Sequence, residues 1–195
     1  MGTMSRHGVL ETERLWLRPL EESDLARLIE FMGERGVTDF LLFFSYPIDG
    51  EQVRSWLENV LAADPQGCAY WALAERTDPG RLVGVISLTL ENYHRKGEIG
   101  FWLDRSRWNR GYMTEAAWRV VRYAFDDLKL HRVEITHMVK NRASRRVVEK
   151  LGFQQEGCWR EGHYKEGQFL DVCLYGMLEV DYLRAQKRFA AAGKG

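Results

Sequence analysis

The chain has 195 residues, of which 45% are hydrophobic and 29% are charged, with 28 basic and 28 acidic side chains. That length can bury the core of one folded domain, and the zero formal charge gives no electrostatic reason to expect nucleic acid or an anionic membrane as the main partner. No apolar run approaches the roughly 20 residues that span a bilayer, and no secretory signal is visible at the N-terminus. We therefore expect a cytoplasmic protein, either a monomer or a homodimer.

The cysteines and histidines give no sign of a metal site. Cys68, Cys158 and Cys173 lie far apart and are odd in number, so they match neither a disulfide framework nor the spacing of metal ligands. Only His131 and His137 share a short segment, and no cysteine or carboxylate completes a ligand set beside them. The sequence predicts small buried thiols in a reduced compartment and no bound metal.

The N-terminal part of the chain is predicted to form a strand followed by a helix. Alternating apolar residues favour a strand over residues 10–20, and Ser23 would be the N-cap of a helix over residues 24–32. The aromatic segment 40–47 has two interpretations. It is either a helical turn that covers a pocket or a loop whose rings pack into the core.

The middle of the chain is predicted to add a second helix and a pair of strands. Asp49 and the glutamine three residues later resemble a capping box, which would open a helix ending near Ala62. Residues 69–75 and 82–90 are typical of strands, and the turn sequence at 77–80 would join them as a hairpin.

The C-terminal half is predicted to alternate strands and helices. Its elements are a strand over 98–103, a helix over 114–128, a strand over 132–139, a helix over 144–151 with Gly152 as its C-cap, strands over 153–164 and 169–178, and a helix over 179–189. Interleaved helices and antiparallel strands indicate an α/β (α+β) domain, with one central sheet and helices on both faces. We expect one domain over residues 1–195, with a core over about 10–180 and a helical tail over 179–190.

The turn between the strand 98–103 and the helix 114–128 is suited to bind a phosphate. The first turn of a helix leaves backbone N–H groups without partners, and the helix dipole adds positive potential there. Arg110 would add a cation, and Gly111 would let a phosphate or pyrophosphate approach the backbone closely. Strand–turn–helix units with one glycine are common, so the turn alone does not decide a function.

Four segments of the chain have counterparts in one known family. They are Trp-Asn-Arg-Gly-Tyr-Met-Thr-Glu-Ala at 108–116, Leu-Glu-Thr-Glu-Arg-Leu-Trp-Leu-Arg-Pro-Leu at 10–20, Asn-Arg-Ala-Ser at 141–144 followed by Glu-Lys-Leu-Gly-Phe at 149–153, and a hairpin with Glu156, Gly157 and Asp171. In this order they resemble the GNAT superfamily of N-acetyltransferases, and in particular its branch of ribosomal-protein-alanine N-acetyltransferases. The first segment is similar to that family's acetyl-CoA-binding turn.

The resemblance implies a three-layer fold around a mixed, mostly antiparallel sheet, with acetyl-CoA as the co-substrate. The backbone amides of the turn would bind the pyrophosphate, Trp102 and Leu103 would pair with the pantetheine like an added strand, and Asn141 would hold the pantetheine arm. The implied cofactor-binding residues are Trp102, Leu103, Asn109, Arg110, Gly111, Tyr112, Met113, Thr114, Asn141 and Ser144. Asn109 stands where this branch often has glycine, and Met113 where glycine or alanine is usual. We expect binding to persist, because backbone donors survive a change of side chain, although the Met113 side chain could crowd the phosphates.

Acetyl transfer to an amine needs a base, because an α-amine titrates near pH 8 and a lysine near pH 10.4. Glu98, a carboxylate inside an otherwise apolar strand, is the candidate base, and Glu134 and His163 are the alternatives. Glu98 would otherwise form an ion pair with Lys96 or Arg132.

Two further groups complete the implied chemistry. The resemblance implies that a backbone amide near Trp102 binds the oxyanion and that Ser144 donates a proton to the departing thiolate. Ser144 would otherwise be only the N-cap of its helix. Aromatic rings that either line an acceptor pocket or pack in the core are those of Phe40, Phe43, Phe44, Tyr46, Trp71 and Trp102.

Two classes of function remain open at this point. The leading hypothesis is an enzyme that transfers the acetyl group of acetyl-CoA to a primary amine, foremost a protein N-terminal α-amine, by direct attack in a ternary complex. Its acceptor could also be a small amine such as a polyamine or an aminoglycoside antibiotic, although the balanced charge offers no acidic funnel for polycations. The other class is a non-catalytic acyl-CoA-binding module.

Overall fold

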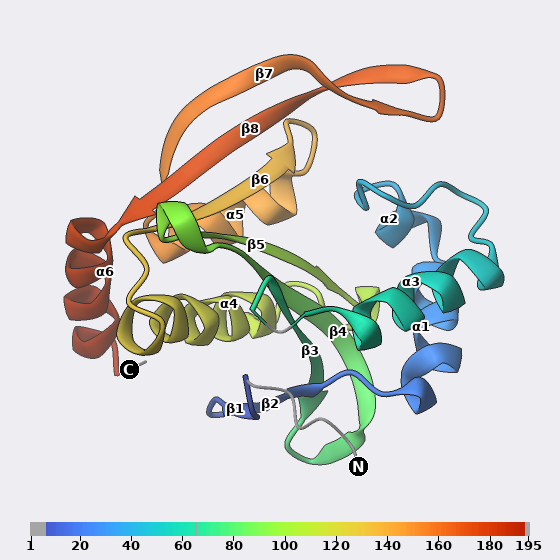
Figure 1. Ribbon diagram of the computed structural model, residues 1–195, viewed down its shortest axis with the longest axis horizontal. Helices are drawn as coiled ribbons and strands as arrows, with labels where there is room; N and C mark the ends of the chain where they lie inside the picture. The colour runs from blue at the N-terminus through green and yellow to red at the C-terminus, as the bar shows by residue number, and fades with distance from the viewer. Residues whose placement is uncertain (1–6, 65, 194–195) are drawn as a thin grey trace.

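The computed structural model describes residues 7–64 and 66–193, and within this part eight strands form one sheet in the order β1-β2-β3-β4-β5-β6-β8-β7 (Figure 1). The strands are β1 (Leu10–Glu11), β2 (Leu15–Pro19), β3 (Cys68–Glu75), β4 (Asp78–Glu91), β5 (Lys96–Leu103), β6 (Arg132–Met138), β7 (Gln154–Lys165) and β8 (Gln168–Leu178). Neighbouring strands run antiparallel except for β5 and β6, which are parallel. The expected mixed, mostly antiparallel sheet is confirmed.

Helices cover both faces of this sheet. They are α1 (Leu25–Met32), α2 (Arg35–Thr38), α3 (Gly50–Ala62), α4 (Tyr112–Arg122), α5 (Arg142–Leu151) and α6 (Glu179–Ala191), with 3₁₀ turns at Glu22–Asp24, Asn92–His94 and Arg105–Arg107 and a π-helical turn at Tyr123–Asp127. One face packs against α4, α5 and α6 through a large apolar cluster. The other face packs against α1, α2 and α3 through a second cluster. The molecule therefore has the three layers that the family resemblance implies.

Strand β5 lies between the two apolar clusters, and its side chains alternate between them. Ile99 and Leu103 are buried in the cluster that contains α4. Trp102 packs on the opposite side, with the residues of α1 and α3. Because successive side chains of a strand point to opposite faces, Glu98 lies on the same face as Trp102. This face, covered by α1–α3, holds the polar residues considered below.

The structure corrects two predicted strand boundaries. Residues 10–20 form a small hairpin rather than one strand, because Thr12 N donates to the Leu15 carbonyl (3.0 Å) and Leu15 N donates to Thr12 Oγ1 (2.9 Å). The turn predicted at 77–80 is shorter than expected. Strand β4 already begins at Asp78, which is the register partner of the last residue of β3.

The structure also corrects two predicted helix starts. Ser23 is not an N-cap, because a 3₁₀ turn precedes α1 and is closed by Glu21 N, which donates to Asp24 Oδ2 at 2.9 Å. The helix predicted over 114–128 begins two residues earlier, at Tyr112, and its last turn is π-helical. Its first turn therefore lies directly behind the glycine of the preceding turn.

Other local predictions are confirmed in part. Asp49 is the N-cap of α3 and accepts a hydrogen bond from Glu51 N, but among the described residues Gln52 makes no reciprocal bond that would complete a capping box. Gly152 ends α5 in the left-handed region with φ of 94°, where glycine avoids the steric cost of a Cβ atom. The segment 40–47 is irregular and not a helical turn. Within it Phe44 is buried, whereas Phe43 is 89% exposed.

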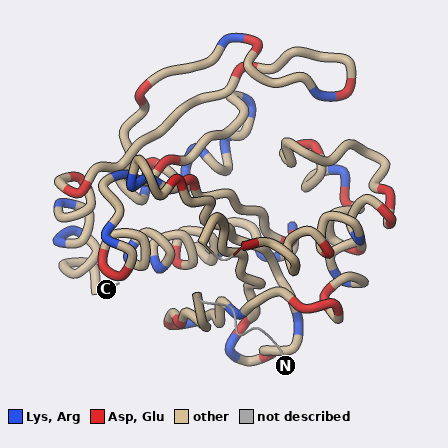
Figure 2. The backbone as a smooth tube through the Cα atoms, viewed as in Figure 1, with Lys and Arg blue, Asp and Glu red and all other residues tan. Residues whose placement is uncertain are grey.

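Charged residues of both signs are distributed over the strands, helices and loops that the structure describes (Figure 2). None of the described helices is long and apolar enough to cross a membrane.

Candidate functional site

Strands β5 and β6 pair only over their first residues and then diverge. Their parallel register runs from Lys96, opposite Arg132, to Glu98, opposite Glu134. Strand β5 continues to Leu103 in contact with β4, and β6 continues in contact with β8. The two edges that face each other beyond Glu98 therefore have backbone groups without a strand partner, which suits an extended ligand that binds as an added strand. One of these groups is already used, since the Leu103 carbonyl accepts from the indole of Trp108 (2.8 Å).

Two helices begin at the open end of this V-shaped gap. Because β5 and β6 are parallel, their C-terminal ends lie at the same edge of the sheet, and α4 and α5 each follow one of these ends. A side-chain contact joins the two helix starts, because Arg146 of α5 donates to Asn109 Oδ1 at 3.3 Å. The gap is therefore bordered at its open end by two helix N-termini, which attract anionic groups.

The turn before α4 has the geometry of an anion-binding site. Gly111 is the N-cap of α4 and has φ of 81° and ψ of −1°, a left-handed conformation that favours glycine. The first hydrogen bond of the helix is made by Glu115 N, which donates to the Gly111 carbonyl at 3.0 Å. Within the described part of the chain, no group accepts from the N–H groups of residues 111–114. Four consecutive backbone donors are thus available to a phosphate.

The two departures from the family pattern have physical explanations. Asn109 has φ of 60°, and asparagine is among the non-glycine residues that best tolerate this left-handed region. It can therefore replace a glycine without changing the course of the turn. Met113 is buried in the apolar cluster beneath α4. The expectation that Met113 crowds the phosphates is wrong, because its side chain points into the core while its N–H faces the turn.

Arg14, a residue that the sequence reasoning did not single out, holds this turn in place. Its Nη1 donates to the Arg110 carbonyl (2.9 Å), its Nε donates to Glu115 Oε2 (2.6 Å), and its guanidinium lies 4.4 Å from the centre of the Tyr112 ring. Glu115 also accepts from Thr12 Oγ1 at 2.6 Å. The β1–β2 hairpin thereby fixes the first turn of α4, and no sequence spacing indicated this contact.

The side chain of Tyr112 points away from the phosphate position. Its hydroxyl donates to Glu75 Oε1 at 2.7 Å, and this hydrogen bond is the main reason why the pKa of Glu75 is lowered and that of Tyr112 is raised. Arg107 donates to the other oxygen of Glu75 at 2.9 Å. Tyr112 would therefore contribute to an anion site through its backbone N–H only.

At the start of α5 the N-cap is Asn141 and not Ser144. Asn141 is the N-cap, because its Oδ1 accepts from Ser144 N at 3.0 Å. The interpretation of Ser144 as an N-cap is therefore wrong: it lies in the first helical turn, and its half-buried hydroxyl makes no hydrogen bond with the residues that the structure describes. Among the residues that the structure describes, none accepts from the amide N–H₂ group of Asn141, which is therefore available for a ligand.

The carboxylates of Glu98 and Glu134 are register neighbours but have different partners. Glu134 accepts from Arg132 Nε (2.6 Å) and lies 3.6 Å from the Lys96 ammonium. Glu98 is exposed and accepts from Thr136 Oγ1 at 2.7 Å. The expected pairing of Glu98 with Lys96 or Arg132 is therefore wrong, since both cations bind Glu134. Of the two carboxylates, Glu98 is the one whose partner is neutral, and it lies where the strands begin to diverge.

Aromatic side chains form a second feature on the same face of the sheet. Trp56 of α3 lies at their centre, with its ring 5.4 Å from that of Trp102, 5.9 Å from Tyr70 and 6.1 Å from Phe44. Trp102 Nε1 is buried and has no hydrogen-bond partner among the described residues. Trp71 belongs to the opposite face and is 1% exposed, so it is a core residue and cannot line this region.

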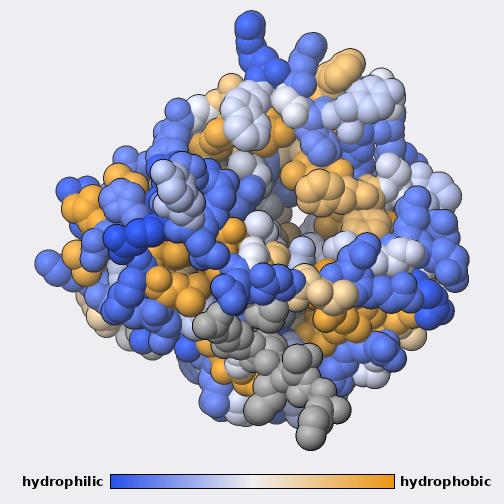
Figure 3. All heavy atoms as spheres, viewed as in Figure 1, coloured by the Kyte–Doolittle hydropathy of each residue, from blue (hydrophilic) through white to orange (hydrophobic). Residues whose placement is uncertain are grey.

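A groove of about 440 Å³ borders this aromatic group. We call it the α3 groove, and its lining residues are Phe43, Phe44, Asp49, Glu51, Gln52, Ser55, Trp56 and Asn59. Phe44 and Trp56 belong to both the groove and the aromatic group. Figure 3 shows the molecule hollowed near its centre, in the region where Figure 1 places the diverging β5 and β6 and the segment that follows α2.

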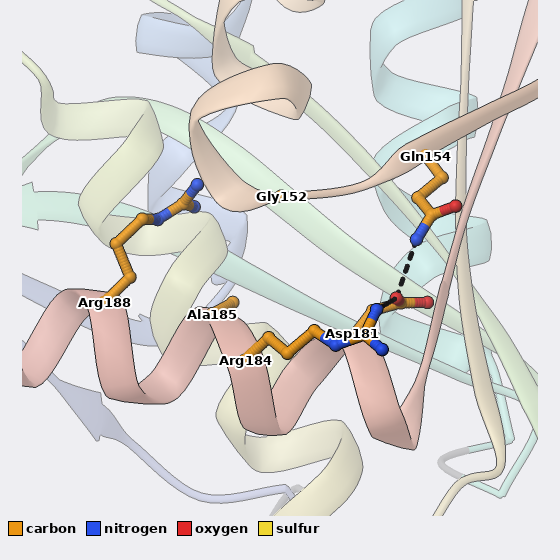
Figure 4. A pocket seen from close by; sticks show the side chains of 6 residues that line it. All are labelled: Gly152, Gln154, Asp181, Arg184, Ala185 and Arg188. Atoms are coloured by element: carbon orange, nitrogen blue, oxygen red, sulfur yellow. Dashed lines mark hydrogen bonds and ion pairs between the residues drawn. The ribbon is translucent and has the colours of Figure 1, made fainter.

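A second cavity, of about 240 Å³, lies apart from these features, between the end of α5 and helix α6 (Figure 4). Its polar side chains already have partners: Gln154 Nε2 donates to Asp181 Oδ1 (2.7 Å) and Arg188 donates to the Lys150 carbonyl (2.5 Å). These contacts attach α6 to the domain. Across residues 7–64 and 66–193, no three His, Cys, Asp or Glu side chains are grouped to hold a metal ion.

Comparisons with known proteins bear on these features. The family model described as "Acetyltransferase (GNAT) domain" matches residues 14–154. The chain is 33% identical over 178 residues to "Putative ribosomal N-acetyltransferase YdaF" of Bacillus subtilis (strain 168), covering 87% of this chain and 94% of that protein. It is 28% identical over 129 residues to "Ribosomal-protein-serine acetyltransferase" of Escherichia coli (strain K12), covering 66% and 71%. A solved GNAT-family acetyltransferase from Bacillus anthracis has 25% identity and a TM-score of 0.78, covering 88% of this chain and 99% of that one.

Proposed function

The chain belongs to the GNAT family of acetyltransferases, and we propose that it transfers the acetyl group of acetyl-CoA to a protein N-terminal α-amine by direct attack in a ternary complex. The observation that carries this proposal is the gap between β5 and β6. Glu98 lies at its closed end, and the free amides of residues 111–114 border its open end. A long anionic thioester could thus bind with its phosphates at the helix start and its acyl group near a carboxylate.

Different residues around the gap would carry out the separate steps of acetyl transfer. The neutral amine attacks the thioester carbonyl, an N–C bond forms, and Glu98 takes the proton that the amine loses. An unpaired backbone N–H of β5, near Trp102, donates to the oxyanion of the tetrahedral intermediate. The C–S bond then breaks, and Ser144 Oγ donates a proton or a hydrogen bond to the thiolate. Glu98 and Ser144 act in this proposal as catalytic residues.

Two observations favour a protein N-terminus as the acceptor. Two relatives carry names that describe ribosomal or ribosomal-protein acetyltransferases. The α3 groove offers aromatic rings together with polar side chains, which is the mixed lining that an extended peptide needs to bury its side chains and bind its backbone. Glu98 and the aromatic group share the face of the sheet that this groove borders.

Mass spectrometry of an acceptor panel tests the proposal. The panel contains decapeptides with a free N-terminal Ser, Ala or Met, the same peptides with a blocked N-terminus and an internal lysine, spermidine, and kanamycin, each incubated with acetyl-CoA. We expect the mass of one acetyl group to be added to the free N-terminal peptides and not to the blocked ones. Acetylation of spermidine or kanamycin instead would identify a small-molecule enzyme. Acetyl-CoA binding without any transfer would identify a binding module and overturn the proposal.

Ser144 allows a sharper test now that Asn141 is known to be the N-cap. Ser144→Ala removes the hydroxyl but leaves the backbone N–H that Asn141 binds, so we expect an unchanged melting temperature. We expect kcat to fall by about 10-fold, less than the 10²–10⁴-fold typical of general acid–base groups, because a thiolate is a good leaving group. Ser144→Thr, which keeps a hydroxyl, should retain more activity. Full activity of Ser144→Ala would show that water protonates the thiolate.

A further inference from the structure

The tip of the β7–β8 hairpin contacts a segment that lies far away in the sequence. Figure 1 shows the hairpin arching over the domain toward α2 and the segment that follows it. Within residues 38–46, five backbone groups form hydrogen bonds with side chains of the hairpin tip, across separations of 120 to 127 residues. We call this set of contacts the clasp; its hairpin residues are His163, Lys165 and Glu166.

Lys165 is the centre of the clasp. Its side chain is buried, with 7% of the residue exposed. Its ammonium donates to three backbone carbonyls, those of Thr38 at 2.8 Å, Leu41 at 2.6 Å and Phe44 at 2.5 Å. An ammonium has three donors, so each finds an acceptor, as a buried charge requires. The cation also lies at the C-terminal end of α2, where the helix dipole favours a positive charge.

Two other residues of the hairpin tip add to this attachment. His163 has its Nε2 2.9 Å from the Leu42 carbonyl, and its ring packs edge-on against that of Phe43. Glu166 Oε1 accepts from Tyr46 N at 3.0 Å. His163 was an alternative candidate for the catalytic base, and this hydrogen bond gives it a different role, as an anchor of the segment.

The hairpin is built to bring its tip to this position. Its two-residue turn, Glu166–Gly167, has φ of 48° and 82°, the left-handed pair that joins twisted strands tightly. Below the tip, the register shifts between Trp159 and His163, and such a bulge bends a strand. Gly162 lies in the bulge, and a Cβ atom there would be only 2.6 Å from Trp159 Cβ. The bend therefore depends on a glycine at this position.

The clasped segment supplies part of the α3 groove. Phe43 and Phe44 both line the groove, and Phe44 also contacts the ring of Trp56. The carbonyl of Phe44 is one of the three acceptors that Lys165 binds. Release of the segment would therefore displace an aromatic wall of the groove, whereas the turn before α4 would be unaffected because it is held separately by Arg14.

We propose that Lys165 is a positioning residue for the acceptor amine, because it locks the segment 38–46 against the hairpin and so holds the aromatic wall of the α3 groove. This inference rests on the proposed function, in which the α3 groove receives the acceptor. On this inference, loss of Lys165 weakens binding of the acceptor and leaves binding of acetyl-CoA unchanged.

Steady-state kinetics of Lys165→Met test this assignment, with the best acceptor of the panel above as the probe. Methionine fills a similar volume but removes the donor that the carbonyls of Thr38, Leu41 and Phe44 share. We expect KM for the acceptor to rise at least about 10-fold, while KM for acetyl-CoA changes less than about 2-fold. Lys187→Met is the matched control, because Lys187 is exposed on α6 and makes no contact with the segment. Lys165→Arg, which keeps the cation, should restore part of the acceptor affinity.

A second pair of variants leaves every clasp residue in place. Gly162→Ala should displace the hairpin tip through the clash with Trp159, whereas Gly157→Ala on the same strand meets nothing within 4 Å. We expect Gly162→Ala to raise the acceptor KM and Gly157→Ala to behave like the wild type. Hydrogen–deuterium exchange should show faster exchange of residues 38–46 in Lys165→Met and in Gly162→Ala, with unchanged exchange in α4.

The outcomes separate the two proposals. A wild-type protein that acetylates no amine overturns the proposed function, whatever the exchange data show. If the wild type is active, two results for Lys165→Met would overturn the role of Lys165 alone. One is an unchanged KM for the acceptor, and the other is an equal rise in KM for the acceptor and for acetyl-CoA. Faster exchange over 38–46 with an acceptor-specific rise in KM supports it.

Discussion

Glu98→Gln is expected to lower kcat/KM by roughly 10²–10⁴-fold, the range of a general base, while affinity for acetyl-CoA stays unchanged. The amide keeps the size of the carboxylate and its hydrogen bond from Thr136 Oγ1, but it cannot accept a proton. Titration of the free acceptor amine near pH 8 should still affect kcat/KM in the variant.

Glu134→Gln is the matched control, since it makes the same chemical change at the register partner of Glu98. Glu134 accepts from Arg132 and lies close to Lys96, so its loss should lower the melting temperature more than kcat. Comparison of Glu98→Gln with Glu134→Gln distinguishes the carboxylate that accepts the proton from one that only contributes negative charge nearby. A slow Glu134→Gln enzyme beside a fast Glu98→Gln enzyme would transfer the role of base to Glu134.

Substitution of Gly111 is expected to have the largest effect on acetyl-CoA. Gly111 has φ of 81°, which proline cannot adopt, so Gly111→Pro should lose the turn together with one N–H donor and abolish binding measured by calorimetry. Arg110→Ala should weaken binding by about 10-fold or less, because an exposed cation adds little to the backbone donors. Circular dichroism would verify that the fold is intact. Full affinity in a folded Gly111→Pro protein would contradict the anion site at α4.

A milder pair of variants separates the anion site from general strain. Gly111→Ala and Gly167→Ala place a Cβ on backbones with φ of 81° and 82°, at a cost of about 1–2 kcal/mol for each. Only Gly111 precedes the free amides of α4. We expect acetyl-CoA affinity to fall by about 10-fold in Gly111→Ala and to stay unchanged in Gly167→Ala. Equal losses in both variants would indicate a global effect.

Much of the site could be predicted because its parts are local in sequence. The turn and the first residues of α4 follow one another along the chain, and their anion-binding property comes from backbone groups that any helix start exposes. For the same reason Asn109 and Met113 could replace smaller residues without loss of the donors. The error about Met113 concerned its side chain, whose direction depends on the packing of α4 against the sheet.

Some predictions failed on the local course of the chain, and others on contacts between distant segments. Ser144 and Asn141 are both good caps by residue type, and only the course of the chain after β6 selects Asn141. The aromatic rings of Trp56 and Tyr70 were missed because neither belongs to an unusual local pattern. Trp56 meets Tyr70 and Trp102 only when α3 lies across β3 and β5.

The sequence by itself determined the family, most of the strands and helices in their order, and the turn that we propose binds the phosphates, because hydrophobic periodicity, caps and glycines act over a few residues. Only the tertiary structure decided which of two strand carboxylates is left with a neutral partner. The register of β5 against β6 brings Lys96 to Glu134 and Thr136 to Glu98, and Glu134 also binds Arg132 of its own strand. The tertiary structure also decided which groups Lys165 binds. The carbonyls that surround Lys165 come from residues more than 120 positions earlier, and no local pattern encodes a contact across that distance.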